Sequence, residues 1–193
     1  MICIKKITDN DFNLKNMPLD NPRVRYGARG IVLNSDGKIA ILCKKNKNEY
    51  KLIGGGIEEY EEPNNAFLRE VLEESGCIVK IDKCIGTIEE IKSQDNFKQI
   101  SYVFISHVIE DTGRTHYTQK EKDEGAELLW VDLDDAINLI KNCESKLVAS
   151  KYESVYHTKF IVRRDYEILK YYQSVILNWL WSIVMVVYYT WKE

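Results

Sequence analysis

One acidic segment bounded by glycines constrains the fold of this chain more than any other feature. Residues 55–77 read Gly-Gly-Ile-Glu-Glu-Tyr-Glu-Glu-Pro-Asn-Asn-Ala-Phe-Leu-Arg-Glu-Val-Leu-Glu-Glu-Ser-Gly-Cys. Pro63 suits the first turn of a helix, and Gly76 suits the left-handed position just past its end. The pattern therefore predicts a helix from about residue 62 to residue 75. Its apolar positions form one arc, which can pack on a sheet while acidic side chains face away from it.

Three carboxylates of the predicted helix, Glu70, Glu73 and Glu74, lie three and four residues apart. This spacing places them on one helical face, within reach of a single cation. Without a counter-ion, like charges so placed cost about 0.2–0.5 kcal/mol per pair. A solvated acidic face is the ordinary explanation of such a run of glutamates. The glycines and the arginine at fixed offsets around these carboxylates favour a cation site instead.

The rest of the chain alternates between strand and helix patterns. An Asp-Gly turn at residues 34–37 joins two β-rich runs and predicts a hairpin. The polar stretch 110–125 is expected to be a loop. Strands before and after the acidic helix favour an α/β or α+β sandwich over an all-α fold. The expected strands are 24–33, 38–43, 49–53, 78–91, 99–109 and 126–131, and the further helices are 132–143 and about 151 to the end.

Length and composition limit the function classes. A chain of 193 residues with 45% hydrophobic residues fits one domain, or one domain with an appendage. Its net charge of −3 argues against binding to a nucleic-acid polymer, which usually requires a basic surface. The five scattered cysteines form no Cys-x-x-Cys pair, which favours reduced thiols in a cytoplasmic protein. The first residues show no secretory signal pattern.

Segment 55–77 resembles the signature of the Nudix hydrolase family, of which MutT is the model. That signature is Gly, five residues, Glu, seven residues, Arg-Glu, an aliphatic residue, any residue, Glu-Glu, any residue, Gly and an aliphatic residue. Every defined polar and glycine position matches, and Cys77 replaces the last aliphatic residue as a small apolar side chain. The matching residues are Gly55, Glu61, Arg69, Glu70, Val71, Glu73, Glu74 and Gly76.

The resemblance implies an α/β/α sandwich around a mixed β-sheet. It also implies hydrolysis of a nucleoside diphosphate linked to another moiety, with Mg²⁺ or Mn²⁺ as cofactor. Clustered carboxylates agree with this expectation because they select hard divalent cations, which bridge phosphate oxygens and activate water. We expect an N-terminal segment (1–22), a Nudix domain (23–145) and a C-terminal helical extension (146–193).

The resemblance assigns roles residue by residue. Glu70 and Glu74 match the metal ligands of the family, and Glu73 is expected to be a further ligand. Arg69 matches an orienting residue, and Glu61 is expected to support the loop. Glycines let the backbone approach a pyrophosphate closely, and this role falls to Gly54, Gly55 and Gly56. The general base is either a helix carboxylate or an acid of the polar loop, where the candidates are Glu121, Asp123 and Glu124.

The substrate is only loosely indicated. The family marker for ADP-ribose, a proline about sixteen residues after the signature, is missing, because Pro63 is the last proline of the chain. A nucleoside triphosphate or another small nucleotide is therefore the default substrate. Tyr102 and Phe104 are candidates for stacking on a base, although their alternation is also typical of sheet packing. A Nudix-fold module that binds or senses nucleotides without cleaving them is the alternative function.

The tail 171–191 contains no charged residue and carries Tyr and Trp at both ends. About twenty such residues are long enough to cross a bilayer. Polar residues within the tail dilute its hydropathy, so a packed helix or a homodimer-forming helix is the plainer expectation, with a membrane anchor as the minority interpretation.

Overall fold

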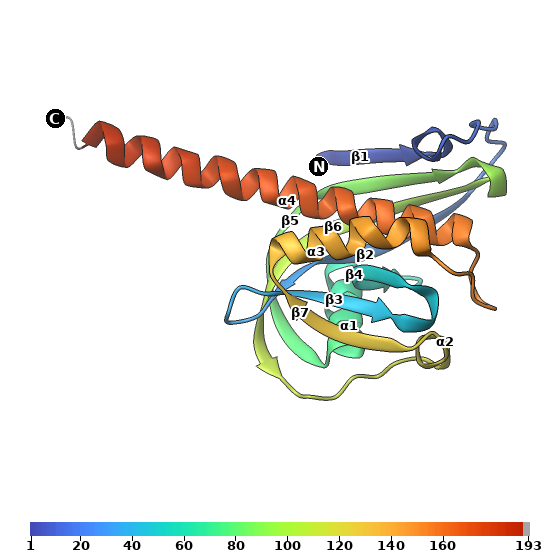
Figure 1. Ribbon diagram of the computed structural model, residues 1–193, viewed down its shortest axis with the longest axis horizontal. Helices are drawn as coiled ribbons and strands as arrows, with labels where there is room; N and C mark the ends of the chain where they lie inside the picture. The colour runs from blue at the N-terminus through green and yellow to red at the C-terminus, as the bar shows by residue number, and fades with distance from the viewer. Residues whose placement is uncertain (191–193) are drawn as a thin grey trace.

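A seven-stranded mixed sheet organises the chain (Figure 1). The computed structural model describes the backbone of residues 1–190 and the side chains of residues 1–177. Along the sheet the strands follow the order β1-β5-β6-β2-β4-β3-β7. The pairs β1–β5 and β2–β6 are parallel, and the remaining neighbours are antiparallel. The strands are β1 (Cys3–Thr8), β2 (Arg23–Leu33), β3 (Ile39–Lys44), β4 (Glu49–Gly56), β5 (Cys77–Lys92), β6 (Phe97–Asp111) and β7 (Ala126–Val131).

Helices cover both faces of this sheet (Figure 1). Helix α1 packs against one face, and helices α3 and α4 pack against the other. This arrangement confirms the predicted α/β/α sandwich with a C-terminal helix. The helices are α1 (Pro63–Ser75), α2 (Gln119–Asp123), α3 (Leu133–Cys143) and α4 (Val155–Thr190).

Local sequence explains where α1 begins and ends. Pro63 occupies the first helical position, where its missing N–H is no loss. Gly76 adopts a left-handed conformation with φ of 71° and donates its N–H to the carbonyl of Leu72 at 2.9 Å. Phe67 is fully buried and stacks on Phe104 of β6, with ring centroids 5.0 Å apart. The apolar face therefore anchors α1 to the sheet, and Phe104 is a packing residue.

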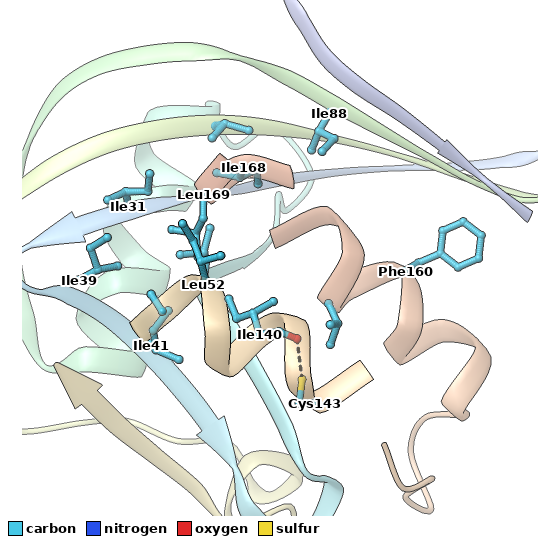
Figure 2. Close-up of a cluster of buried hydrophobic side chains, with 14 of the residues drawn as sticks. Ile31, Ile39, Ile41, Leu52, Ile88, Ile140, Cys143, Phe160, Ile168 and Leu169 are labelled. Atoms are coloured by element: carbon cyan, nitrogen blue, oxygen red, sulfur yellow. Dashed lines mark hydrogen bonds between the residues drawn. The ribbon is translucent and has the colours of Figure 1, made fainter. Parts of the chain in front are cut away.

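The opposite face of the sheet holds a core to which α4 belongs (Figure 2). Ile31 of β2 and Leu52 of β4 meet Ile140 of α3 and Leu169 of α4, and all four side chains are completely buried. Figure 2 shows Phe160, from the first turns of α4, in the same cluster. The beginning of the C-terminal helix thus shares one hydrophobic core with the sheet.

Two expectations about the elements were incomplete or wrong. The stretch 110–125 is not all loop, because it contains α2. There the side chain of Thr118 accepts a hydrogen bond from the amide of Glu121, and Glu121 accepts one from the amide of Thr118. This reciprocal cap stabilises a short helix that composition alone does not reveal. The other difference is β1, an edge strand within the N-terminal segment that pairs in parallel with β5.

The tail 171–191 falls mostly outside the residues whose side chains are described. Within the part of the chain that was described, no helix is long and apolar enough to cross a membrane. The membrane anchor and the homodimer stay predictions.

Candidate active site

A cleft of about 840 Å³ opens beside the C-terminal end of β4. Its walls come from both sides of the sheet: α1 supplies glutamates, and α4 supplies His157, Ile161 and Arg164. Gly54, Gly55 and Gly56 lie between these two walls. Nine lysine and arginine side chains line the cleft beside seven glutamates. The cleft can therefore hold cations near its acidic wall and anions elsewhere.

Arg69 organises the acidic wall. Its Nε and Nη2 donate to the two carboxylate oxygens of Glu61, each at 2.9 Å. Its Nη1 donates to Glu70 at 2.9 Å and to Glu73 at 3.3 Å, and Nη2 also reaches the carbonyl of Gly56 at 3.0 Å. The hydrogen bonds to Glu61, ahead of those to Glu70, raise the pKa of Arg69 above its ordinary value. One guanidinium thus binds three signature carboxylates and the glycine loop.

Glu74 is placed differently from its two neighbours on the helix. The residue is 2% exposed, and its carboxylate accepts hydrogen bonds from Lys51 Nζ at 2.7 Å and from the amide of Gly54 at 2.9 Å. Burial raises the pKa of Glu74, although the attraction of Lys51 opposes this shift. Lys51, which the sequence reasoning missed, therefore supplies the counter-ion of this carboxylate. Lys51 stands directly before a run of apolar residues and glycines, and this position gives no recognisable signal in the sequence.

The three consecutive glycines leave room for functional side chains. A Cβ on Gly55 would overlap the carboxylate of Glu70, and a Cβ on Gly56 would lie 2.5 Å from Nη2 of Arg25. Gly54 has φ of 134°, and a Cβ there would lie 2.5 Å from the backbone Cα of Arg29. Gly54 is therefore required by the backbone, whereas the other two are required by charged side chains that face the cleft.

Among the loop acids, the structure brings only Glu121 to the lining of the cleft. Burial would raise the pKa of Glu121, but the amide and hydroxyl of Thr118 outweigh it and lower the pKa. Asp123 lies elsewhere, where Lys151, Tyr152 and Gln119 lower its pKa. Glu124 is buried against Lys44 at 2.9 Å and Ser150 at 2.6 Å. Of these three candidates, Glu121 is the one that the cleft can use.

The sequence reasoning also missed most of the basic lining. Arg23, Arg25 and Arg29 occupy alternate positions of β2 and face the cleft, with Gly27 between them. Such a period-two row of arginines is a signal that the sequence offered. Lys92 and Arg164 lie far from the signature in sequence, and only the fold brings them to the same cleft.

The NUDIX domain family model matches residues 23–151. This chain belongs to the Nudix family. The match begins with β2 and ends before α4, so it includes the acidic wall of the Nudix cleft and excludes the wall that α4 supplies.

Curated relatives are phosphohydrolases. Diphosphoinositol polyphosphate phosphohydrolase 3-alpha of Mus musculus is 31% identical over 123 residues, which cover 62% of this chain and 69% of the relative. Diphosphoinositol polyphosphate phosphohydrolase NUDT4B of Homo sapiens is 23% identical over 120 residues. The chain spans 62% of the length of this human relative. Together with the family match, these relatives support a Nudix hydrolase that acts on phosphorus-containing anhydrides.

Solved structures agree with the Nudix fold. The crystal structure of UDP-X diphosphatase has a TM-score of 0.51 at 15% identity, covering 82% of this chain and 66% of that one. A NUDIX hydrolase from Nitrosomonas europaea has a TM-score of 0.50 at 15% identity, covering 75% and 93% respectively. At this level of identity the likeness concerns the fold alone.

Nudix proteins generally use divalent metal ions, and the acidic wall has suitable donors. Glu70 and Glu73 both reach the same guanidinium nitrogen, Nη1 of Arg69, so their carboxylates already converge on one cationic centre. Oxygen donors of this kind suit Mg²⁺ and Mn²⁺. Among the side chains of residues 1–177, no group of three or more His, Cys, Asp or Glu is arranged to hold a metal ion. Arg69 forms ion pairs with Glu70 and Glu73, and Lys51 forms one with Glu74.

The glycine contacts predict different outcomes for two neighbouring substitutions. Gly54→Ala is expected to lower the free energy of unfolding by about 1–3 kcal/mol, because the new Cβ meets rigid backbone at an unfavourable φ. Gly55→Ala is expected to change stability by less than about 1 kcal/mol. It should instead lower the catalytic rate, because the Glu70 carboxylate must move. Urea denaturation and initial rates on both variants test this, and equal stability losses would contradict it.

A buried ion network at the α4 side of the cleft predicts a dependence of stability on pH. Burial opposes ionisation of Glu90, but Arg164, Lys92 and Arg29 outweigh it and lower the pKa of Glu90 from 4.5 to about 2. The difference between these two pKa values corresponds to a stabilisation on the order of 3 kcal/mol, because ionised Glu90 favours the folded state. This stabilisation is fully present above pH 4.5 and is lost as the pH falls towards 2.

Denaturation of wild type and Glu90→Gln between pH 6 and pH 2 measures this contribution. The difference in the free energy of unfolding between the two proteins should shrink below pH 4.5. Glu89→Gln is the matched control, because Glu89 forms a partly exposed ion pair with Lys98 at 3.1 Å, and such pairs contribute about 0–1 kcal/mol. Parallel curves for wild type and Glu90→Gln would show that Glu90 is not the titrating group.

Proposed function

We propose that this Nudix protein hydrolyses a diphosphate linkage in a phosphate-rich small molecule, with Mg²⁺ or Mn²⁺ as cofactor. The observation that carries the proposal is that the carboxylates of Glu70 and Glu73 both accept hydrogen bonds from Nη1 of Arg69 at the acidic wall of the cleft. Nine lysine and arginine side chains line the same cleft. Such a cleft can hold both a divalent cation and the phosphates that the cation must contact.

The residues of the cleft would have different roles in this reaction. Glu70, Glu73 and Glu74 would hold the metal ion, which when bound neutralises phosphate charge and lowers the pKa of a water molecule. Arg69 would orient these ligands, as its hydrogen bonds to Glu61 and Gly56 support. Water would form a new bond to one phosphorus, and the bond from that phosphorus to the bridging oxygen would break. A glutamate carboxylate, either on α1 or at Glu121, would take the proton of the water.

The lining favours a phosphate-rich substrate over one selected by its base. Among the described residues of the cleft, Phe97 is the one aromatic side chain apart from His157. Tyr102 does not line the cleft, and Phe104 is buried in the core. The mouse relative is named for diphosphoinositol polyphosphate, and such a compound matches the basic lining. A nucleoside triphosphate or a nucleoside diphosphate derivative is the second candidate, with UDP-X diphosphatase as the structural parallel.

A substrate panel separates these proposals. The full chain is incubated with a diphosphoinositol polyphosphate, a nucleoside triphosphate and a nucleoside diphosphate sugar, each with Mg²⁺, with Mn²⁺ and with a chelator. Metal-dependent release of phosphate or a phosphorylated fragment is expected, with the highest kcat/KM for the inositol compound. Turnover of none of the three, combined with thermal stabilisation by the same ligands, would instead favour a nucleotide-binding or sensor module. Cytoplasmic location is a separate proposal, tested by fractionation.

A further inference from the structure

Five buried charged groups lie at the α4 side of the cleft, three of them in its lining, and their charges do not balance. Three are the cations Arg29, Lys92 and Arg164, which are 4%, 3% and 1% exposed. Two are the carboxylates Glu90 and Asp165, both fully buried. Arg164 donates to Glu90 at 2.9 Å and to Asp165 at 2.8 Å, and Lys92 donates to Glu90 at 2.9 Å. These bonds pair the cations Arg164 and Lys92 with the two carboxylates. The positive charge of Arg29 is not matched by a third carboxylate in this group.

Arg29 lacks the partners that a buried guanidinium usually has. Its Nε is buried and has no hydrogen-bond partner among the described residues. Burial, and then repulsion by Arg164, lowers the pKa of Arg29 to about 10. An unpaired buried charge costs several kcal/mol, so a chain retains one when something else supplies the counter-charge.

The position of Arg29 shows where that counter-charge would lie. Gly27, two residues before it on β2, has no side chain to fill the space between Arg29 and the glycine loop. A Cβ on Gly27 would lie 3.5 Å from Nη2 of Arg29 and 2.9 Å from the carbonyl of Gly55. The guanidinium therefore faces the cleft next to the glycine loop, on the side of the sheet that carries α4.

We propose that Arg29, Lys92 and Arg164 form an anion-binding subsite that takes a phosphate group of the substrate at the α4 end of the cleft. This inference rests on the proposed hydrolysis of a phosphate-rich substrate and assigns the residues that select it. A guanidinium can bind phosphate oxygens in a bidentate manner, and burial strengthens the attraction. Arg164 and its neighbours Ile161 and His157 come from α4, beyond the residues that the family model matches. Specificity at this end of the cleft therefore depends on the C-terminal helix as well as on Arg29 of β2 and Lys92 of β5.

The subsite makes opposite predictions for stability and for binding when Arg29 is replaced by Met. Without Arg29 the two remaining cations match the two carboxylates, so the unliganded variant should melt at the same temperature as wild type or higher. Binding of inositol hexakisphosphate, a probe without a diphosphate linkage, should weaken by about tenfold to a hundredfold, as expected for a lost charge-assisted hydrogen bond. Calorimetric titration and thermal melts, both without metal, measure the two effects.

Two further variants complete the experiment. Arg29→Lys keeps the charge and should restore part of the binding, and Arg114→Met removes an exposed arginine that does not line the cleft and should change neither quantity. A purely structural role of Arg29 predicts the reverse pattern, with a lower melting temperature and unchanged affinity for the probe. That pattern would overturn the proposal.

Kinetics separate this proposal from the proposed function. In an active enzyme, Arg29→Met should raise KM for the inositol substrate at least tenfold and change kcat less than threefold. If wild type binds the probe through Arg29 but cleaves no diphosphate, the hydrolase proposal fails and the subsite stands. If wild type cleaves the substrate and the Arg29→Met variant binds the probe as tightly as wild type, the subsite fails alone.

Discussion

Replacing Glu70 by Gln is expected to lower kcat by about 10²–10⁴-fold, the range for loss of a group that activates the attacking water. The carboxylate of Glu70 lies against Gly55, accepts a hydrogen bond from Arg69 at 2.9 Å and lines the cleft. A glutamine can still accept that hydrogen bond, so the fold should persist while the negative charge is lost. Initial rates at saturating Mg²⁺ together with a thermal melt measure both parts of this prediction.

Glu62→Gln is the matched control, because Glu62 is exposed at the start of the same helix and does not line the cleft. Its kcat should equal that of wild type. Glu74→Gln is a less clean test, because it leaves the largely buried Lys51 without its carboxylate partner and changes stability as well. A Glu70→Gln protein with the kcat of wild type would show that Glu70 takes no part in catalysis.

Replacing Arg164 by Leu is expected to lower the free energy of unfolding by about 3–5 kcal/mol. Its guanidinium is 1% exposed and is the shared partner of Glu90 and Asp165, both of which are fully buried. Removing it leaves Glu90 with Lys92 as its one hydrogen-bonded cation. It leaves Asp165 with the amide of Leu52 but no hydrogen-bonded cation among the described residues. The large cost comes from the carboxylates that remain, not from the ion pairs that are lost.

The adjacent residue supplies the control for this second prediction. Arg163 pairs with Glu144 through contacts of 2.9–3.2 Å, but both side chains are about a quarter exposed. Arg163→Leu should therefore cost only about 0–1 kcal/mol. Urea denaturation of the two variants compares the same chemical change one residue apart. Similar losses of stability would contradict the assignment of the buried network to Arg164.

The signature helix was predictable because its information is local. Pro63 and Gly76 mark its ends, and the spacing of Glu70, Glu73 and Glu74 follows from helical geometry. The hairpin between β2 and β3 was predictable from its Asp-Gly turn for the same reason. The short helix α2 was missed because its reciprocal cap involves only Thr118 and Glu121 in a stretch whose composition favours a loop.

The charged partners of the site were not predictable, because they are brought together by long-range packing. Lys51 meets Glu74 across 23 residues, and Arg164 meets Glu90 across 74. No local pattern distinguishes such a lysine or arginine from a solvated one. The sequence predicted the acidic wall that α1 supplies, but the basic side chains of the cleft depend on where β2, β5 and α4 lie in the finished fold.

The place of α4 in the core has a practical consequence for work on this protein. The residues that the family model matches, 23–151, look like a module that can be excised. An excised piece would lose Phe160, Ile168 and Leu169 from the core and Arg164 from its two carboxylates. A truncation that ends at the conventional boundary should therefore yield insoluble or inactive protein. Such a failure would say nothing about catalysis, because the acidic wall would have lost the helix that forms the opposite side of its cleft.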